Sequence, residues 1–139
     1  MKFRTITAGL TLVLAAAAAG LGTGAASAYG QKQTLGMLDE LDHGGWELRE
    51  RGGPVRNICL DSGRRLIQLR HPGQPCSSVV VDDQSDQVTV QYSCRGQGYG
   101  RTHIRRETDG LIQIDSQGIV NGVPFSFSAE GRRAGDCRN

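Results

Sequence analysis

The chain has 139 residues, with 16 basic and 14 acidic side chains, three histidines and four cysteines. Two of the basic residues, Lys2 and Arg4, fall within the first 28 positions, so the remaining chain carries 14 charges of each sign. Binding to nucleic acid rests on an excess of Lys and Arg facing phosphates, and this balance therefore argues against a nucleic-acid partner.

The first 28 residues have the features of a bacterial export signal. Lys2 and Arg4 precede an apolar stretch from Ile6 to Ala19, and small residues follow at Ala26-Ser27-Ala28. We therefore expect cleavage after Ala28 and a periplasmic or secreted location, with no stable membrane span once the signal is removed. The mature chain would hold 111 residues, 29–139, which is the usual size of one domain.

The pattern of apolar residues divides the mature chain into two parts. In residues 29–43, Leu35, Leu38 and Leu41 recur at three-residue spacing, which fits either one or two helical turns laid against the domain or a loosely attached N-terminal arm. From Gly44 onward, short alternating apolar runs are interrupted by Gly, Asp and Asn, a pattern typical of antiparallel β structure. We therefore expect an arm at 29–43 and a single β domain at 44–139.

The β domain contains about seven runs that read as strands. Apolar and polar residues alternate most regularly in Gln87–Cys94 and Val123–Glu130, so that each strand covers a core on one side and meets water on the other. Asp109-Gly110 and Asn121-Gly122 are dipeptides that favour tight hairpins between neighbouring strands. The other expected strands are Gly45–Glu50, Val55–Leu60, Cys76–Val81, Gly100–Thr108 and Leu111–Val120.

These elements predict a mainly β fold, an antiparallel up-and-down meander of about seven strands. Closure into a small barrel or a curled sheet is expected because long open edges invite aggregation. One stretch departs from the strand pattern: residues 61–69 begin with the helix-capping Asp61 and Ser62 and predict a short helical excursion.

The four cysteines, Cys59, Cys76, Cys94 and Cys137, form an even set in a small exported chain and are expected to form two disulfides. They contain no Cys-x-x-Cys pair and no histidine stands within four residues of any of them, so we expect no metal. Cys76 and Cys94 are each nine residues from Ser85, which favours Cys76–Cys94 with Cys59–Cys137. The alternative, Cys59–Cys76 with Cys94–Cys137, stays open.

No motif of a catalytic site or of a cofactor site occurs. The chain lacks the Gly-x-Ser-x-Gly, His-Glu-x-x-His and Gly-x-x-x-x-Gly-Lys-Ser/Thr patterns. The glycine-rich run 96–100 is interpreted as a hairpin turn, because no helix pattern follows it to form a phosphate site. We therefore expect no catalytic residues, no cofactor and no enzyme activity.

Two sets of residues are candidates for binding. Arg101, His103 and Arg105 alternate on one strand face and would form an anion-accepting strip, suited to envelope polymers with phosphate or carboxylate groups. Trp46 is the only tryptophan and is expected in the core. It could instead line a pocket for an apolar ligand. The other members of that pocket would be Tyr92, Phe125 and Phe127.

Several short motifs resemble one bacterial secreted family, the domain of unknown function 3617. They are Gly44-Gly45-Trp46-Glu47-Leu48, Cys59-Leu60, Tyr92-Ser93-Cys94-Arg95-Gly96 and Gly131-Arg132-Arg133-Ala134-Gly135-Asp136-Cys137. The resemblance covers nearly all of the mature chain. It implies an exported, cysteine-bearing β domain and supplies neither an activity nor catalytic residues.

Two functional hypotheses follow. The first is a monomeric, non-enzymatic envelope module that binds an unidentified ligand or protein through the concave face of its sheet or through its glycine-rich turn. The second is a secreted inhibitor of an envelope-active hydrolase such as lysozyme. An inhibitor would need a projecting loop to plug the cleft of its target, and Arg95–Tyr99 is the segment we expect to provide it.

Overall fold

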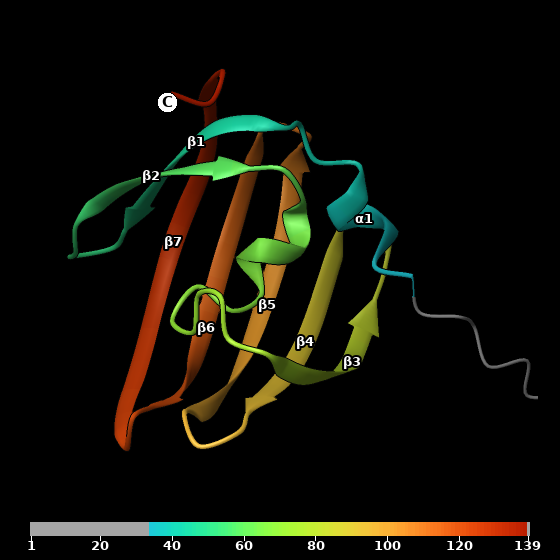
Figure 1. Ribbon diagram of the computed structural model, residues 1–139. Helices are drawn as coiled ribbons and strands as arrows, with labels where there is room; N and C mark the ends of the chain where they lie inside the picture. Colours follow the sequence, from blue (N-terminus) through green and yellow to red (C-terminus); the bar gives the residue numbers. More distant parts are fainter. Residues whose placement is uncertain (1–33, 139) are drawn as a thin grey trace, which may run out of the picture. The chain divides into compact units, whose positions relative to one another are not determined.

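The computed structural model describes residues 34–138, which form seven antiparallel strands, one turn of α-helix and one 3₁₀ turn (Figure 1). The predicted export signal and residues 29–33 lie outside the described residues. The elements are α1 (Gly36–Asp39), β1 (Gly44–Glu50), β2 (Val55–Leu60), η1 (Gly63–Leu66), β3 (Cys76–Asp83), β4 (Gln87–Cys94), β5 (Gly98–Thr108), β6 (Leu111–Val120) and β7 (Val123–Gly135). The prediction of a mainly β, up-and-down fold with a helical excursion is confirmed.

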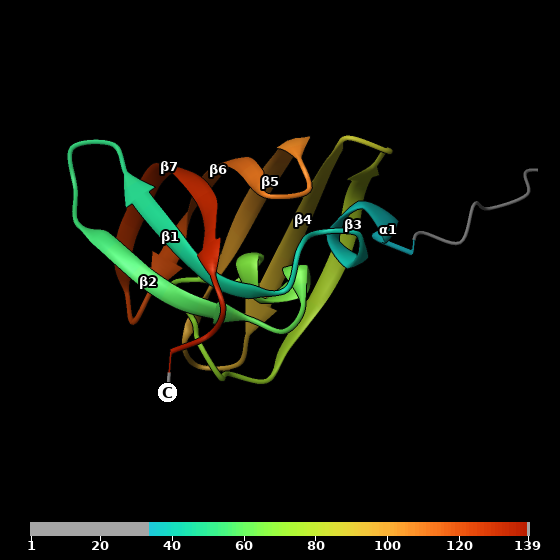
Figure 2. The same cartoon turned by 90° about the horizontal axis from the view of Figure 1, so that it is seen from above.

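The seven strands form one sheet in the order β2-β1-β7-β6-β5-β4-β3. Every strand pairs with its neighbour along the chain except β2 and β3, and β1 pairs with β7. This is the order of an up-and-down barrel left open between β2 and β3. The sheet is curled and not closed (Figure 2), because residues 61–75, including η1, cross the concave side between these two strands.

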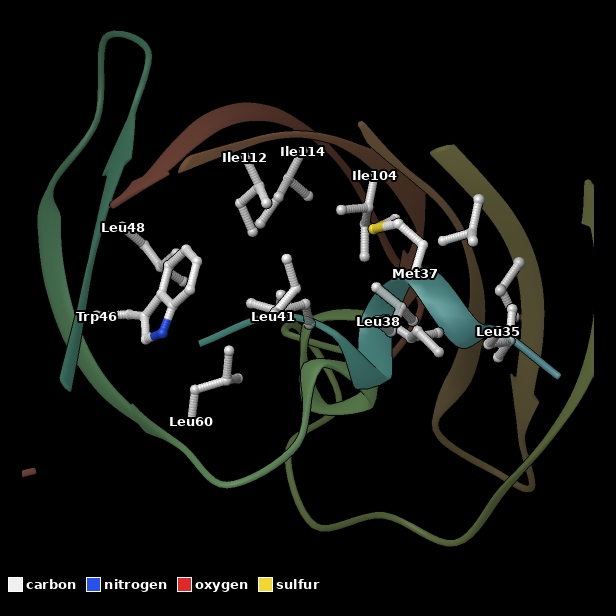
Figure 3. Packing of buried hydrophobic residues seen from close by; sticks show 14 of the residues in the cluster. Leu35, Met37, Leu38, Leu41, Trp46, Leu48, Leu60, Ile104, Ile112 and Ile114 are labelled. Carbon is white, nitrogen blue, oxygen red and sulfur yellow. The ribbon is translucent and has the colours of Figure 1, made fainter. Parts of the chain in front are cut away.

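The concave side of the sheet is filled by α1 and its neighbours. Leu38 of α1 is completely buried, and Leu35, Met37 and Leu41 are at most 5% exposed. These side chains belong to the same cluster as Trp46 and Ile104, and in Figure 3 they extend from beside Trp46 to beyond Ile104. The apolar side chains of residues 34–43 therefore belong to the core, which supports the packed helical turn and not the loose arm, and the domain begins before Gly44.

The alternation of the strands decides which side chains meet this core. The inward-facing residues of β4, β5 and β6 are almost completely buried: Val88, Val90, Tyr92, Ile104, Ile112 and Ile114. Each buried aliphatic side chain contributes about 1.5–3 kcal/mol. The segment η1 joins the same core through Gly63, where a Cβ atom would collide with the carbonyl oxygen of Leu38. Glycine is thus required where η1 meets α1.

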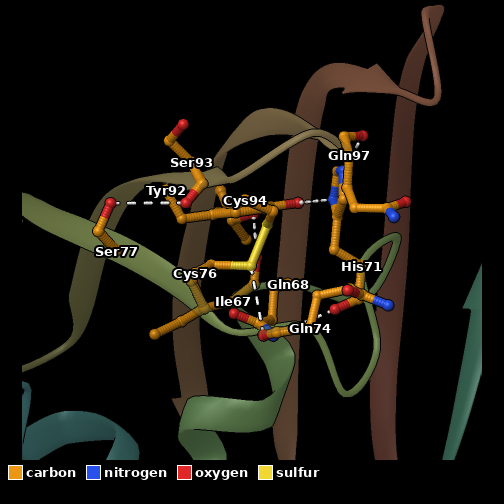
Figure 4. The surroundings of a disulfide bond; sticks show 11 residues. Ile67, Gln68, His71, Gln74, Cys76, Ser77, Tyr92, Ser93, Cys94 and Gln97 are labelled. Carbon is orange, nitrogen blue, oxygen red and sulfur yellow. Dashed lines mark hydrogen bonds between the residues drawn. A yellow bond between two sulfur atoms is a disulfide. The ribbon is translucent and has the colours of Figure 1, made fainter.

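Two disulfides brace the sheet, Cys59–Cys137 and Cys76–Cys94. They are the first of the two pairings considered from the sequence. Cys76 lies opposite Cys94 in the β3–β4 ladder, with Cα atoms 4.2 Å apart (Figure 4). Cys59–Cys137 ties the end of the chain to the edge strand β2. Such bonds are consistent with an oxidising, extracytoplasmic compartment.

Candidate binding surface

Trp46 and Tyr92, two of the four side chains that were candidates for an apolar ligand pocket, lie inside the core. Trp46 is 1% exposed and its indole Nε1 donates to the carbonyl of Asp42 over 2.8 Å. Tyr92 is 2% exposed. Phe125 and Phe127 are partly buried and stack with ring centroids 6.3 Å apart. Trp46 and Tyr92 therefore belong to the buried core, whereas Phe125 and Phe127 are partly buried and each contributes to the lining of a shallow hollow.

His71 is buried against Tyr92 on the same side of the sheet (Figure 4). Its Nε2 lies 3.1 Å from the carbonyl oxygen of Gln97, and its Nδ1 lies 3.1 Å from the Tyr92 hydroxyl. Because a carbonyl only accepts, Nε2 carries a proton, and in the neutral imidazole the tyrosine then donates to Nδ1. Burial raises the pKa of Tyr92, and the positive charge of Arg70 offsets part of this rise. His71 is thus committed to the internal network.

On the concave side, the buried carboxylate of Glu50 forms ion pairs with two arginines. Glu50 accepts from Arg56 over 2.7 Å and from Arg70 over 2.8 Å, and its side chain is only 7% exposed. The guanidinium of Arg70 also stacks over the ring of Phe127 at 4.4 Å. The arginines of this cluster serve as partners of Glu50 and not as a free anion site.

The outer face of β4–β7 carries the predicted anion strip. Tyr99, Arg101, His103 and Arg105 alternate along β5 with the buried Gly100, Thr102 and Ile104. The cationic strip, defined as Arg101, His103 and Arg105, therefore does lie on one face. The register places glutamines on both sides of Arg101, Gln91 on β4 and Gln117 on β6.

The three members of the cationic strip differ in their partners. Arg105 donates to Glu107 over 2.9 Å, and His103 Nδ1 lies 3.0 Å from Thr89 Oγ1. Asp115, the cross-strand neighbour of His103 on β6, bonds instead with Ser128 on β7. Within residues 34–138, the exposed guanidinium of Arg101 makes neither a hydrogen bond nor an ion pair. Arg101 is therefore the strip's available cation.

Two shallow hollows adjoin at Arg101. One, of about 480 Å³, is lined by Tyr99, Gln117 and Pro124 among others, and the other, of about 300 Å³, by His103, Asp115 and Gln117. Tyr99 is 49% exposed and presents its ring beside the first hollow. Neither Tyr99 nor the two glutamines, Gln91 and Gln117, were expected in this site from the sequence. The alternation that predicts the cationic strip also places Tyr99 on its face.

A third hollow, of about 630 Å³, lies on the same outer face toward β1. His103 and Arg105 contribute to it, together with Arg49 of β1 and Glu130 of β7. Hydrogen bonds to Arg132 and Gln113 lower the pKa of the Glu130 carboxyl, which therefore stays ionised. Charges of both signs line this hollow, so it favours anions less than the two at Arg101.

The glycine-rich turn between β4 and β5 is short and fixed. The amide of Gln97 donates to the carbonyl of Cys94 over 3.0 Å, and the Gln97 carbonyl accepts from the amide of Asn121 over 2.9 Å. His71 donates to the same carbonyl. The segment Arg95–Tyr99 is therefore a bound turn that runs directly into β5, and the expectation of a projecting loop at this position is wrong.

The histidines are distributed over separate parts of the domain. His71 is buried, His103 lies on the outer face, and His43 is exposed just before β1. In the part of the chain that the structure describes, no three His, Cys, Asp or Glu side chains gather closely enough to hold a metal ion. Nor does any helix between residues 34 and 138 have the length and apolar character needed to cross a bilayer. Comparisons with family models, curated proteins and solved structures found no match.

Proposed function

We propose that this protein is an exported, non-enzymatic envelope module that binds through the outer face of β4–β7. Export by cleavage after Ala28 and a periplasmic or secreted location are part of this proposal. The two disulfides support it, because such bonds persist in oxidising compartments outside the cytoplasm. The resemblance to the domain of unknown function 3617 agrees with export and adds no activity.

The unpartnered guanidinium of Arg101 is the observation that carries the proposal. Most other arginines of the described chain are engaged by carboxylates or carbonyls, whereas Arg101 lines two shallow hollows of the outer face. Amide side chains flank it on both neighbouring strands. A guanidinium offers paired donors that match carboxylate or phosphate oxygens.

The chemistry of the surroundings favours a polymer over a small ion. The hollows are open and run along several strands, so a chain can lie across them. The exposed ring of Tyr99 can contact the face of a sugar ring, while Gln91 and Gln117 can bond to hydroxyl groups. The ligand class is therefore an envelope polymer that bears carboxylate or phosphate groups.

The structure changes the surface that we assign to binding. The sequence favoured the concave face or the glycine-rich turn, but α1, η1 and the aromatic residues fill the concave side. The turn at Gln97 is held by three hydrogen bonds. The same turn was the loop on which the inhibitor alternative depended, and that alternative now lacks its supporting feature.

The proposal can be tested by titration calorimetry on mature protein, residues 29–139. The probes are an oligogalacturonide with carboxylates, a short polyphosphate and neutral dextran. We expect at least one anionic probe to bind with an affinity that falls as salt rises. Dextran should bind at least tenfold more weakly. Arg101→Gln should weaken the anionic complex at least fivefold.

Arg138→Gln is the matched control, because Arg138 is also exposed but lies in the tail beyond Cys137. It should leave the affinity unchanged. Equal losses in both variants would show a non-specific charge effect and contradict the proposal. Absence of binding to both anionic probes would contradict it as well.

A further inference from the structure

The two free edges of the open sheet are built differently. On β2, Arg65 Nη1 covers the carbonyl of Cys59 with a 2.9 Å hydrogen bond, and Cys59 itself is tied to the C-terminal segment by its disulfide. On β3, two valines are exposed, Val79 by 68% and Val81 by 46%, whereas β2 exposes one, Val55, by 49%. An uncovered edge with apolar side chains is a template for pairing with another strand.

The disulfide geometry shows which backbone groups of β3 are free. The 4.2 Å separation of the Cα atoms of Cys76 and Cys94 marks a non-hydrogen-bonded pair of an antiparallel ladder. Alternation then makes Ser77 and Val79 bond to β4, while Ser78 and Val80 direct their N–H and C=O groups away from the sheet. No backbone partner for Ser78 or Val80 occurs elsewhere in residues 34–138.

We propose that β3 pairs antiparallel with β3 of a second copy of this chain, with Val79 opposite its own counterpart. In this register Ser78 of each copy faces Val80 of the other, so the outward-facing backbone groups of both strands are satisfied. The two Val79 side chains meet in a close, non-hydrogen-bonded pair on the outer face. The bulge between Val80 and Asp82 confines the pairing to the first part of the strand.

Charge supports a second copy as the occupant of this edge. Residues 76–81 carry no charged side chain, so two copies can approach without repulsion. Asp82 is the first charged residue after this stretch, and its carboxylate is held by the side-chain amides of Gln84 and Gln87 of its own chain.

The dimer goes beyond the proposed function and does not depend on it. It replaces the monomer expected from the sequence with a continuous sheet whose two outer faces lie side by side. A polymer long enough to reach both faces would then gain by avidity. Failure of polymer binding leaves the dimer intact, and failure of the dimer leaves the affinity for a short ligand intact.

Sedimentation and light scattering of residues 29–139 over a range of concentrations test the dimer. We expect a reversible monomer–dimer equilibrium that Ser78→Pro shifts to monomer. Proline removes only an N–H that points away from the sheet, so the internal β3–β4 ladder stays intact. Circular dichroism and the melting temperature check that this variant is folded.

Val79→Lys is a second variant that does not alter the backbone, and it should also give monomer. Val123→Lys is its control, because Val123 is 63% exposed in the β6–β7 hairpin, far from this edge. A chain that stays monomeric at millimolar concentration, or a dimer that Ser78→Pro and Val79→Lys leave unchanged, would overturn the proposal.

Discussion

The Tyr92 hydroxyl donates to Nδ1 of His71 over 3.1 Å and so joins strand β4 to the segment that crosses the concave side. The two rings meet edge to face, with centroids 5.3 Å apart. The residues are 21 positions apart in sequence, and both are nearly fully buried. The bond therefore fixes residues 61–75, which connect β2 to β3, against strand β4.

Removal of the tyrosine hydroxyl should destabilise the domain. Tyr92→Phe leaves Nδ1 of His71 buried without a donor, which costs about 1–3 kcal/mol of unfolding free energy. Urea denaturation measures this loss. Tyr99→Phe is the control, because Tyr99 is half exposed and makes no side-chain hydrogen bond within residues 34–138, and its effect should stay below about 0.5 kcal/mol. Equal stability of the two variants would contradict the role of the bond.

The same residue predicts a loss of stability at high pH. Burial raises the pKa of Tyr92 above its ordinary value of 10.0, so the unfolded chain ionises this group first. Stability is therefore fully present below about pH 10 and falls as the pH rises through the raised pKa. Denaturation between pH 9 and 11.5 should show this fall, and the slope should be shallower in Tyr92→Phe. An identical slope in both proteins would rule out Tyr92 as its source.

The carboxylate of Glu50 should contribute more to the free energy of unfolding than that of Glu47, which is more exposed on the same strand. Glu50→Gln leaves Arg56 and Arg70 facing each other without a counter-charge, and we expect a loss of about 2–3 kcal/mol. The value lies below that of a fully buried pair because both arginines are about a third exposed, at 32% and 29%. Glu47→Gln breaks only an exposed pair with Arg49 and should cost less than about 1 kcal/mol. Thermal and urea unfolding of both variants decide the comparison.

The two disulfides should contribute unequally. Cys59–Cys137 closes 78 residues of chain separation, and Cys76–Cys94 closes 18. On the loop-entropy account the first bond stabilises the domain by about 4–5 kcal/mol and the second by about 3 kcal/mol. Paired Cys→Ser variants, unfolded without reductant, measure each contribution. A larger loss from the Cys76–Cys94 variant would show that local packing and not chain entropy dominates.

The strands could be predicted because alternation is a local property of the sequence. Leu111–Val120 has the same bounds in the structure, and the hairpin dipeptide Asn121-Gly122 connects it to β7 as expected. Closure of the meander into a barrel implies that β1 lies beside β7, but the register of this pair could not be predicted, because it joins residues 79 to 90 positions apart without a turn signal between them. For the same reason, the sequence did not predict that β2 and β3 stay unpaired at the two edges of the sheet.

The site was predictable to a similar degree. Alternation along β5 places Arg101, His103 and Arg105 on one face, as expected. Which of these side chains is available depends on cross-strand and diagonal neighbours, and only the register supplies Gln91 and Gln117 beside Arg101. Trp46 and Tyr92 could be read either as core or as ligand contacts, because residues 35–41, which share their buried cluster, dock by tertiary packing that the sequence does not reveal.

Nuclear magnetic resonance mapping of an anionic oligosaccharide on the mature chain tests the central claim most directly. If the outer face of β4–β7 binds the polymer, the amides that shift on titration with an oligogalacturonide should cluster around Tyr99, Arg101 and Gln117, and Arg101→Gln should require at least fivefold more ligand for the same shifts. Signals of the core residues Trp46 and Leu38 should stay unchanged. Shifts centred on the concave side or on the β1–β2 hairpin, with β5 unaffected, would contradict this account.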